Sequence, residues 1–328
     1  MNTTRKFIFL FLLLLIALVL NLSLGSVILP ASWWVDKFSF STTHSSYDAI
    51  MLYRLSKAAM AVLAGSGLAL SGLIMQNIFR NPIVGPYVLG LSSGAGLGVG
   101  ILILGGSVLG IGHLSQVSIT LASATGSALT LLLIIALYYK LKNPVSLLVA
   151  GLMIGIFAGA LISILSYFTQ ATALQKYVFW SMGNLGSQHF KSIFLLWGVV
   201  LLGIVISIYF IKDLNALLLG ENYAASMGVN IHQTHLILII MTGILAGTVT
   251  AFAGPIAFVG LAVPHLTRIY FKTHLHQYLI PGSILTGAII LLLCDTIAQV
   301  PGSIISLPIN SVTAIFGAPL VIYFIYKK

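Results

Sequence analysis

The stretch Arg54-Leu55-Ser56-Lys57, the apolar, glycine-rich run that follows it to Gln76, and then Asn81-Pro82 decide how this chain folds. Two cations come first, and the run behind them is long enough to cross a membrane as a helix. Asn-Pro then ends that helix, because the residue before a proline is disfavoured in the helical conformation. This segment thus combines charged residues, an apolar span and a helix stop, and the combination indicates a membrane-spanning protein.

The composition of the whole chain supports the same interpretation. Of its 328 residues, 59% are hydrophobic and 6% are charged, and the mean hydropathy is +1.10. These values lie far outside the range of soluble domains. One crossing needs about 20 apolar residues, so we expect a single transmembrane domain over residues 1–328, surrounded by membrane lipid. The net charge of +10 reflects topology and predicts no nucleic-acid partner, because Lys and Arg form no long cluster.

Apolar runs between polar or Pro/Gly breaks predict an all-α fold of about ten membrane helices. We expect them near residues 7–29, 55–78, 87–106, 115–139, 145–168, 192–211, 234–253, 256–270, 279–299 and 308–326. The first run imitates a signal peptide but lacks a small-x-small cleavage site, and we interpret it as a retained helix. The run at 256–270 rises only about 22 Å, so it needs irregular backbone shielded within the protein.

Ten crossings place both termini on one side of the membrane. That side would hold ten of the 15 Lys and Arg residues: Arg5, Lys6, Arg80, Lys140, Lys142, Lys212, Arg268, Lys272, Lys327 and Lys328. The other side would hold Lys37, Arg54, Lys57, Lys176 and Lys191. Because loops rich in Lys and Arg stay in the cytoplasm, we expect both termini to be cytoplasmic.

Glycine recurs at four-residue spacing in three predicted helices. The rows are Gly90, Gly94 and Gly98; Gly151, Gly155 and Gly159; and Gly243 with Gly247. Such rows let helices approach closely, although glycine is also commoner in membrane helices generally. In addition, residues 85–91 echo residues 254–261 with one residue inserted. An odd number of spans separates the two copies, so the echo predicts an inverted repeat, with chance resemblance as the alternative.

The chain offers few groups for catalysis. It has no Gly-x-x-x-x-Gly-Lys-Ser/Thr phosphate loop, so any ATP would be hydrolysed by another protein. Residues 90–94 match Gly-x-Ser-x-Gly, and Ser92 with His265 could form a protease dyad, but helix packing explains the small residues better. The eight histidines lack metal-ligand spacing and Cys294 is the only cysteine. We therefore expect no catalytic residue, metal centre or cofactor.

Polar residues within the apolar sequence are few. Only five residues are acidic, and none lies at the middle of a predicted span, which disfavours an ion-coupled transporter. Asp295 comes nearest, and we interpret it as a helix-end or interhelical hydrogen-bonding group, with a functional role as the alternative. Residues 213–232 form the longest polar stretch on the predicted cytoplasmic side. We expect two short helices around Gly220 and Gly228, which either fit a partner's groove or lie at the membrane interface.

Six short motifs follow one another along the chain. In the first half they are Arg54-Leu55-Ser56-Lys57, Gly72 to Gln76 with Asn81-Pro82, and Gly90 to Gly96. In the second half they are Gly220-Glu221 through Ala224 to Gly228, Gly254-Pro255 through Pro264-His265 to Arg268, and Gly317-Ala318-Pro319. In this order they resemble the FecCD family, the permease subunits of ATP-binding cassette (ABC) importers for iron-siderophores, haem and cobalamin.

The resemblance extends over nearly all of the chain and implies a type II ABC importer permease fold in the cytoplasmic membrane. It implies a homodimer or paired permease around a central path, two ATPase subunits below, and an extracytoplasmic substrate-binding protein above. The permease would move a bulky chelate by alternating access and have no catalytic residue of its own. A secondary transporter driven by an ion gradient and an intramembrane protease are the alternatives.

The roles of individual residues follow by position from the same resemblance. Arg54 and Lys57 would face outward and pair with acidic residues of the binding protein. Residues 213–229 would enter a groove of the ATPase, with coupling residues Leu217, Gly220, Glu221, Ala224, Ala225 and Gly228. The fifth and tenth helices would line the path, with Gly151, Gly155, Gly159, Pro308, Asn310 and Thr313 near the substrate.

Four positions depart from the family's pattern. Ser56 replaces the proline of Arg-Leu-Pro-Arg. Gln299 stands where related permeases often carry an outward Arg, which leaves one positive docking contact fewer. Ser306 and Asn310 replace Glu and Gly in Glu-Leu-Pro-x-Gly at the outer mouth. Since none of these changes introduces an intramembrane charge, we expect them to affect the gate and the partner rather than the fold.

Overall fold

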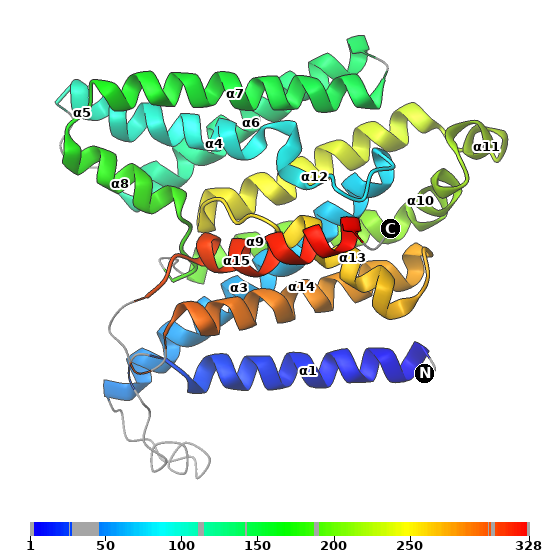
Figure 1. Ribbon diagram of the computed structural model, residues 1–328, viewed down its shortest axis with the longest axis horizontal. Helices are drawn as coiled ribbons and strands as arrows, with labels where there is room; N and C mark the ends of the chain where they lie inside the picture. Colours follow the sequence, from blue (N-terminus) through cyan, green and yellow to red (C-terminus); the bar gives the residue numbers. More distant parts are fainter. Residues whose placement is uncertain are drawn as a thin grey trace.

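Long apolar helices make up most of the computed structural model, which describes residues 3–25, 27, 46–110, 115–141, 143–186, 190–300, 302 and 306–326 (Figure 1). The helices of the first half are α1 (Thr3–Ser23), α3 (Ser46–Ile78), η1 (Pro86–Leu89), α4 (Leu91–Gly100), the π-helical turn η2 (Ile101–Gly105), α5 (Gly106–Val108), α6 (Gln116–Leu141) and α7 (Pro144–Tyr167). Those of the second half are α8 (Ala171–Ser181), α9 (Phe190–Tyr209), α10 (Ile211–Leu218), α11 (Glu221–Ser226), α12 (Ile231–Ala253), α13 (Val259–Phe271), α14 (His276–Ala298) and α15 (Ile309–Tyr326).

Each of the ten predicted spans contains a helix. Eight helical segments of the described residues are long and apolar enough to cross a membrane, and α13 and α15 are the two shorter ones. The all-α, membrane-spanning fold is therefore confirmed. Helix α8 was not predicted, because its eleven residues are only weakly apolar and follow α7 closely. The expected end of the first span at Leu29, and the expected cations Lys37, Lys142, Lys327 and Lys328, lie outside the described residues.

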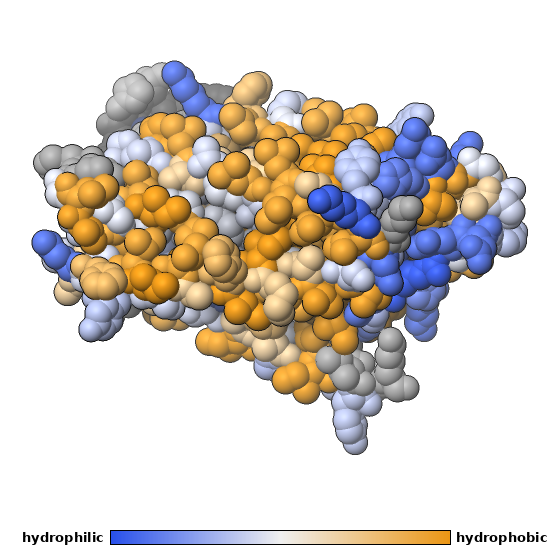
Figure 2. Space-filling view, turned by 90° about the horizontal axis from the view of Figure 1, so that it is seen from above, coloured by the Kyte–Doolittle hydropathy of each residue, from blue (hydrophilic) through white to orange (hydrophobic). Residues whose placement is uncertain are grey.

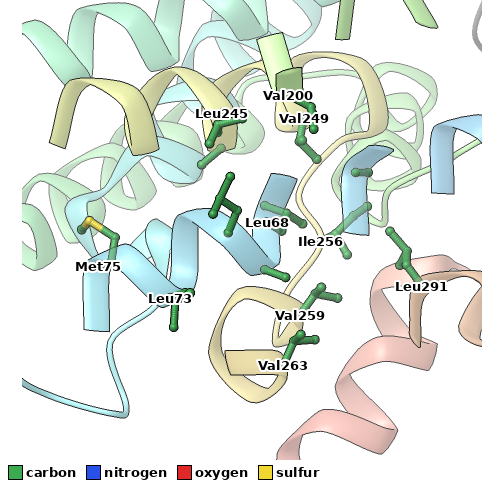
Figure 3. Packing of buried hydrophobic residues seen from close by; sticks show 14 of the residues in the cluster. Leu68, Leu73, Met75, Val200, Leu245, Val249, Ile256, Val259, Val263 and Leu291 are labelled. Carbon is green, nitrogen blue, oxygen red and sulfur yellow. The ribbon is translucent and has the colours of Figure 1, made fainter. Parts of the chain in front are cut away.

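Helix α3 is the axis of the bundle, with α1, α9, α12, α13 and α14 packed around it. Its glycines make this close packing possible, since a Cβ added at Gly65 would overlap the carbonyl oxygen of Gly287, and one at Gly72 would overlap that of Gly260. Figure 3 shows the apolar core that results. Its labelled side chains are Leu68, Leu73, Met75, Val200, Leu245, Val249, Ile256, Val259, Val263 and Leu291.

The predicted glycine rows also lie where helices meet. Gly94 and Gly98 of α4 face the backbone of α6. A Cβ added at Gly94 would lie 2.8 Å from the carbonyl oxygen of Gly126, and a Cβ added at Gly98 would overlap the carbonyl oxygen of Ala122. In α12, an added Cβ at Gly247 would lie 2.9 Å from the Ser127 hydroxyl of α6. Close helix packing is therefore confirmed as the role of these two rows.

The two echoing segments lie against each other, and each leads into a helix. In each copy a helix begins directly after a residue of left-handed conformation, Gly90 at φ 77° before α4 and Phe258 at φ 66° before α13. A Cβ added at Gly260 would lie 2.7 Å from Cδ of Pro86, so the two copies lie side by side. From there α4 runs toward α5 while α13 runs toward the opposite end of the bundle (Figure 1). These opposite directions support the inverted repeat.

Helix α13 has only 13 residues, as the short span at 256–270 predicted. The non-helical backbone before it is covered by the rest of the protein, with Gly254 and Ile256 buried. Asn184 N donates to Ala253 O at 2.8 Å, and Ala257 N donates to Asn310 Oδ1 at 2.9 Å. Irregular backbone at membrane depth is thus shielded and hydrogen-bonded, as its burial requires.

Polar side chains gather at one end of the molecule. In Figure 2 the hydrophilic surface is densest at the right, and a largely apolar surface covers most of the remainder. Figure 1 places α10 and α11 at this end, and both chain termini lie toward it. This placement agrees with the expectation that the two termini share one side. At this end Lys6 Nζ donates to the carbonyls of Tyr270 and Phe271, which ties α1 to the last turn of α13.

Candidate coupling, docking and translocation surfaces

Arg54, one of the two expected docking cations, lies inside the protein at the end opposite α10. Its side chain is only 5% exposed. The guanidinium donates to the carbonyl oxygens of Leu22 at 2.7 Å and Ser23 at 3.2 Å, and to that of Val27. Leu22 and Ser23 belong to the last turn of α1, where a helix leaves its carbonyl acceptors without internal partners. In this structure the Arg54 side chain therefore caps α1 and is not exposed to a partner.

Lys57, the second expected docking cation, forms an ion pair with Asp295 of α14. Lys57 Nζ lies 3.0 Å from Asp295 Oδ1, and the side chains are 14% and 2% exposed. Asp295 Oδ2 accepts hydrogen bonds from Asn21 Nδ2 at 2.9 Å and Gln299 Nε2 at 2.8 Å. The interpretation of Asp295 as an interhelical hydrogen-bonding group is confirmed. Gln299 belongs to this internal cluster, and docking by the two cations stays a prediction.

The expected coupling segment consists of two short helices, α10 and α11, as predicted. Gly220 and Gly228 follow them with φ of 121° and 87°, conformations that favour glycine. Leu217 and Ala224 are buried, and with Ala216 they form a small apolar cluster between the two helices. Leu217 and Ala224, both predicted as coupling residues, therefore hold the segment together from inside, and coupling by this segment stays a prediction.

Other apolar side chains of this segment face outward. Leu219, Tyr223 and Met227 are 66%, 52% and 61% exposed, and Leu218 is exposed beside them. Of the other predicted coupling residues, Ala225 and Gly228 are exposed, and Gly220 and Glu221 are half-buried. Sequence reasoning missed Leu219, Tyr223 and Met227. For Leu219 the helical spacing of Leu214 and Leu217 was the available signal, since it marks the buried face of α10 and leaves Leu218 and Leu219 on the outside.

The three glycines of α7 have different surroundings. Gly151 is buried under η1, where an added Cβ would lie 2.6 Å from Cα of Leu89. Gly155 is half-buried, and its added Cβ would lie 3.2 Å from the hydroxyl of Ser93. Gly159 is exposed and has no atom within 4 Å of an added Cβ. Of the three, therefore, Gly159 leaves an open surface beside the expected path.

The predicted path residues of the tenth span lie at the beginning of α15. Pro308 is half-buried just before the helix. Asn310 donates its backbone N–H to Met182 O at 3.1 Å and accepts from Ala257 N through its side chain. Thr313 is buried and donates to Asn310 O at 3.0 Å. Asn310 stands where the family's pattern has glycine. Its side chain thus stabilises, by a hydrogen bond, the irregular backbone that leads into α13.

A cavity of about 340 Å³ lies between α13, α14 and α15. Thr313, Phe316 and Gly317 of α15 line it on one side, and Val263 of α13 and Cys294 of α14 line it on the other. Cys294 itself is buried. The residues that the structure describes contain no group of three or more His, Cys, Asp or Glu side chains that could hold a metal ion. The lining is nearly all apolar, which suits packing or an apolar guest rather than chemistry.

Comparison with known proteins identifies the family. The model of the FecCD transport family matches residues 13–327, almost the whole chain. The chain belongs to the FecCD transport family. Among similar proteins, the hemin transport system permease protein of Yersinia pestis is 33% identical over 293 residues, 88% of this chain and 86% of that protein. The vitamin B12 import system permease protein of Salmonella typhi is 35% identical over 276 residues, 84% of this chain and 82% of that protein.

A solved structure shares the fold of this FecCD protein throughout. It is described as an inward-facing conformation of a metal-chelate type ABC transporter, and its sequence is 30% identical. The superposition covers 100% of both chains with a TM-score of 0.82. The chain is thus a multi-pass membrane permease with the fold that the six motifs implied.

Two of the FecCD motifs interlock within this permease. Gln76 of the first-half motif donates through Nε2 to Leu261 O at 3.0 Å, and its Oε1 accepts from Arg268 Nη1 at 2.5 Å. Leu261 and Arg268 both belong to the second-half motif, and Gly72 lies against Gly260 in the same contact. The two motifs therefore join α3 to α13, which explains why the pattern combines small residues with an amide and a cation.

Proposed function

We propose that this FecCD permease carries a bulky iron chelate, haem or corrinoid across the cytoplasmic membrane by alternating access, driven by separate ATPase subunits. Family membership supports the proposal, as do the similar permeases named for hemin and vitamin B12. Both named compounds are large macrocycles that hold a metal. The permease itself would supply the path and contribute no catalytic residue.

The observation that carries the coupling role is the apolar surface of the α10–α11 segment. Leu219, Tyr223 and Met227 are exposed at the end of the molecule where hydrophilic side chains gather (Figure 2). Exposed aromatic and Met side chains among polar ones are typical of partner sites. We therefore assign this surface, together with the exposed Ala225 and Gly228, to contact with the ATPase.

The distribution of cations supports cytoplasmic termini. The described cations near the α10–α11 end include Lys6, whose ammonium reaches the last turn of α13, and Lys272, which directly follows α13. Lys140 lies in the last turn of α6, and Lys212 lies in the first turn of α10. An excess of Lys and Arg favours the cytoplasmic side, where an ATPase would meet the permease.

The exposed apolar faces of α7 and α15 support a paired permease. In the most apolar stretch of α7 only 17% of the residues are buried within the chain, whereas 83% are buried in the corresponding stretch of α3. On α7 the exposed side chains include Ile156 and Phe157, and on α15 they include Ile315 and Phe316. We propose that these faces meet a second permease around the path, with Gly159 nearest the open space. A homodimer and a pair of related permeases both satisfy this arrangement.

Reconstitution into vesicles tests the proposal. The permease would be combined with its ATPase and binding protein, and uptake of an iron-siderophore, haem or cobalamin would be measured with and without ATP. We expect uptake of one of these compounds that requires ATP and both partner proteins. Uptake by the permease alone, driven by a proton or sodium gradient, would overturn the proposal in favour of a secondary transporter.

A further inference from the structure

A buried polar cluster joins the α10–α11 segment to the transmembrane helices. Its members are Asn77 in the last turn of α3, Asn215 of α10 and His276, the first residue of α14. His276 Nδ1 lies 2.9 Å from Asn215 Oδ1, and His276 Nε2 lies 2.9 Å from Asn77 Nδ2. His276 is only 1% exposed, so one imidazole bridges two amides away from water.

Backbone groups fix the orientation of both amides. The backbone N–H of His276 can only donate, and it lies 2.9 Å from the Asn215 side-chain atom that faces the imidazole, so that atom is the oxygen Oδ1. The carbonyl of Leu214 can only accept, and it lies 2.9 Å from the Asn77 atom that faces the imidazole, so that atom is the nitrogen Nδ2. Neither amide can be turned over without losing a bond to the backbone.

The two amides in turn fix the state of the imidazole. Nδ1 faces an acceptor and must carry a proton, whereas Nε2 faces an N–H donor and must offer its lone pair. His276 is therefore neutral and protonated at Nδ1. A second proton on Nε2 would point at the amide hydrogens of Asn77, and a proton on Nε2 alone would break both side-chain bonds. A single protonation state therefore holds the cluster together.

The cluster is the tightest polar link between α10 and the bundle among the described residues. The other side-chain bond of α10 to a long helix joins Thr234 Oγ1 of α12 to Asp213 Oδ2 at 3.4 Å, in a half-buried position. Asn215 lies one residue before the buried Ala216 and Leu217, which hold α10 to α11. A displacement of the exposed face of α11 would thus reach α3 and α14 through His276.

We propose that His276 is a positioning residue that transmits the movement of α10 to α3 and α14 during transport, and that it does so only as the neutral Nδ1-protonated tautomer. This inference rests on the proposed function of the chain. His276 would be the side chain through which a conformational change of the ATPase moves the transmembrane helices.

The decisive quantity is the amount of chelate moved per ATP hydrolysed by the reconstituted importer. His276→Leu removes both hydrogen bonds, and His274→Leu is the matched control because His274 is exposed two residues away. We expect the ratio to fall about five-fold or more in His276→Leu, the lower limit of typical coupling between sites, and to stay unchanged in His274→Leu. A purely structural role would lower transport and ATP hydrolysis together and leave the ratio constant, which would overturn the proposal.

Asn215→Ala supplies a second variant in case His276→Leu does not assemble. It deletes the acceptor for Nδ1 on a half-buried side chain and leaves the histidine in place. We expect the same fall in the ratio, and an unchanged ratio in an assembled Asn215→Ala importer would count against the proposal.

Nitrogen-15 NMR of the histidine-labelled permease tests the tautomer independently of transport. We expect one neutral, Nδ1-protonated imidazole whose signal is lost in His276→Leu or shifted in Asn215→Ala. An Nε2-protonated or doubly protonated His276 would refute the inference. If the wild-type importer shows no ATP-driven uptake while the NMR result holds, the proposed function has failed and the assignment of the cluster stands.

Discussion

Lys57 Nζ lies 3.0 Å from Asp295 Oδ1, and this ion pair joins the first half of α3 to the last turn of α14 within the protein. Asn21 of α1 completes the cluster by donating to Asp295 Oδ2. Three helices that are far apart in the sequence thus meet at one carboxylate. Since a charge removed from water costs several kcal/mol, the two ions depend on each other and on the amides around them.

Asp295→Asn should destabilise the permease strongly, because it leaves the ammonium of Lys57 buried without a counter-charge. We expect a loss of roughly 3–5 kcal/mol, seen as a lower melting temperature in detergent. The double variant Lys57→Met/Asp295→Leu should recover most of this loss, because it removes both charges together. Lys176→Met, at an exposed cation of α8, is the control. Equal melting of Asp295→Asn and Lys176→Met would contradict the assigned role of the pair.

Gly72→Ala should disrupt the contact between α3 and α13. A Cβ at this position would overlap the carbonyl oxygen of Gly260, and the backbone there cannot move as a flexible side chain would. We expect a loss of about 1–3 kcal/mol or more, measured as reduced thermal stability and yield of folded protein. Gly198→Ala on α9 is the matched control, since nothing lies within 4 Å of its added Cβ. The prediction fails if the two variants behave alike.

Met227→Asp should weaken the binding of the ATPase to the permease. The change places a charge in the exposed apolar surface formed with Leu219 and Tyr223. We expect at least about a tenfold loss of affinity, as for a hot-spot side chain, measured by co-purification of the ATPase across a concentration series. Permease folding should be unaffected because the Met227 side chain is exposed. Lys140→Gln on α6 tests for a general effect of altered charge, and full binding by Met227→Asp would refute the assigned surface.

Asn310→Gly restores the residue of the family's pattern and should nevertheless destabilise this chain. It deletes the acceptor of the Ala257 N–H, which lies in the irregular backbone before α13. A half-buried N–H that loses its partner costs about 1 kcal/mol, the lower end of the range for buried groups, which a thermal melt in detergent would detect. Ser306→Glu, the other restoration, affects an exposed residue and should leave the melt unchanged. Unchanged melting of Asn310→Gly would show that another group pairs with Ala257.

Most of the fold could be predicted because the bilayer imposes a length on each apolar run. The spans at 115–139 and 234–253 agree closely with α6 and α12. Helix α8 escaped prediction because its apolar content is low and no break separates it clearly from α7. Helix α3 also starts about nine residues earlier than predicted. Asp48 and Arg54 are charged, and the predicted span therefore began only after them.

The candidate sites were harder to predict, because a residue's position in a motif does not tell where its side chain points. Arg54 and Lys57 have the composition of a docking surface, yet their partners lie on α1 and α14, more than 25 residues away in the sequence. The two short helices that contain Leu217 and Ala224 were predicted, but the burial of these two side chains between the helices was not. The cluster around His276 could not be predicted, because the two amides that enclose it come from helices that are distant in the sequence.

The burial of Cys294 makes the unmodified chain suitable for labelling. Because the native thiol is enclosed between transmembrane helices, a maleimide or spin-label reagent would react first with any cysteine introduced at the surface. Cysteines placed at Met227 and Gly159 would then report, without removal of the native cysteine, whether the α11 end of the molecule and the exposed face of α7 change their separation when nucleotide binds to the assembled importer.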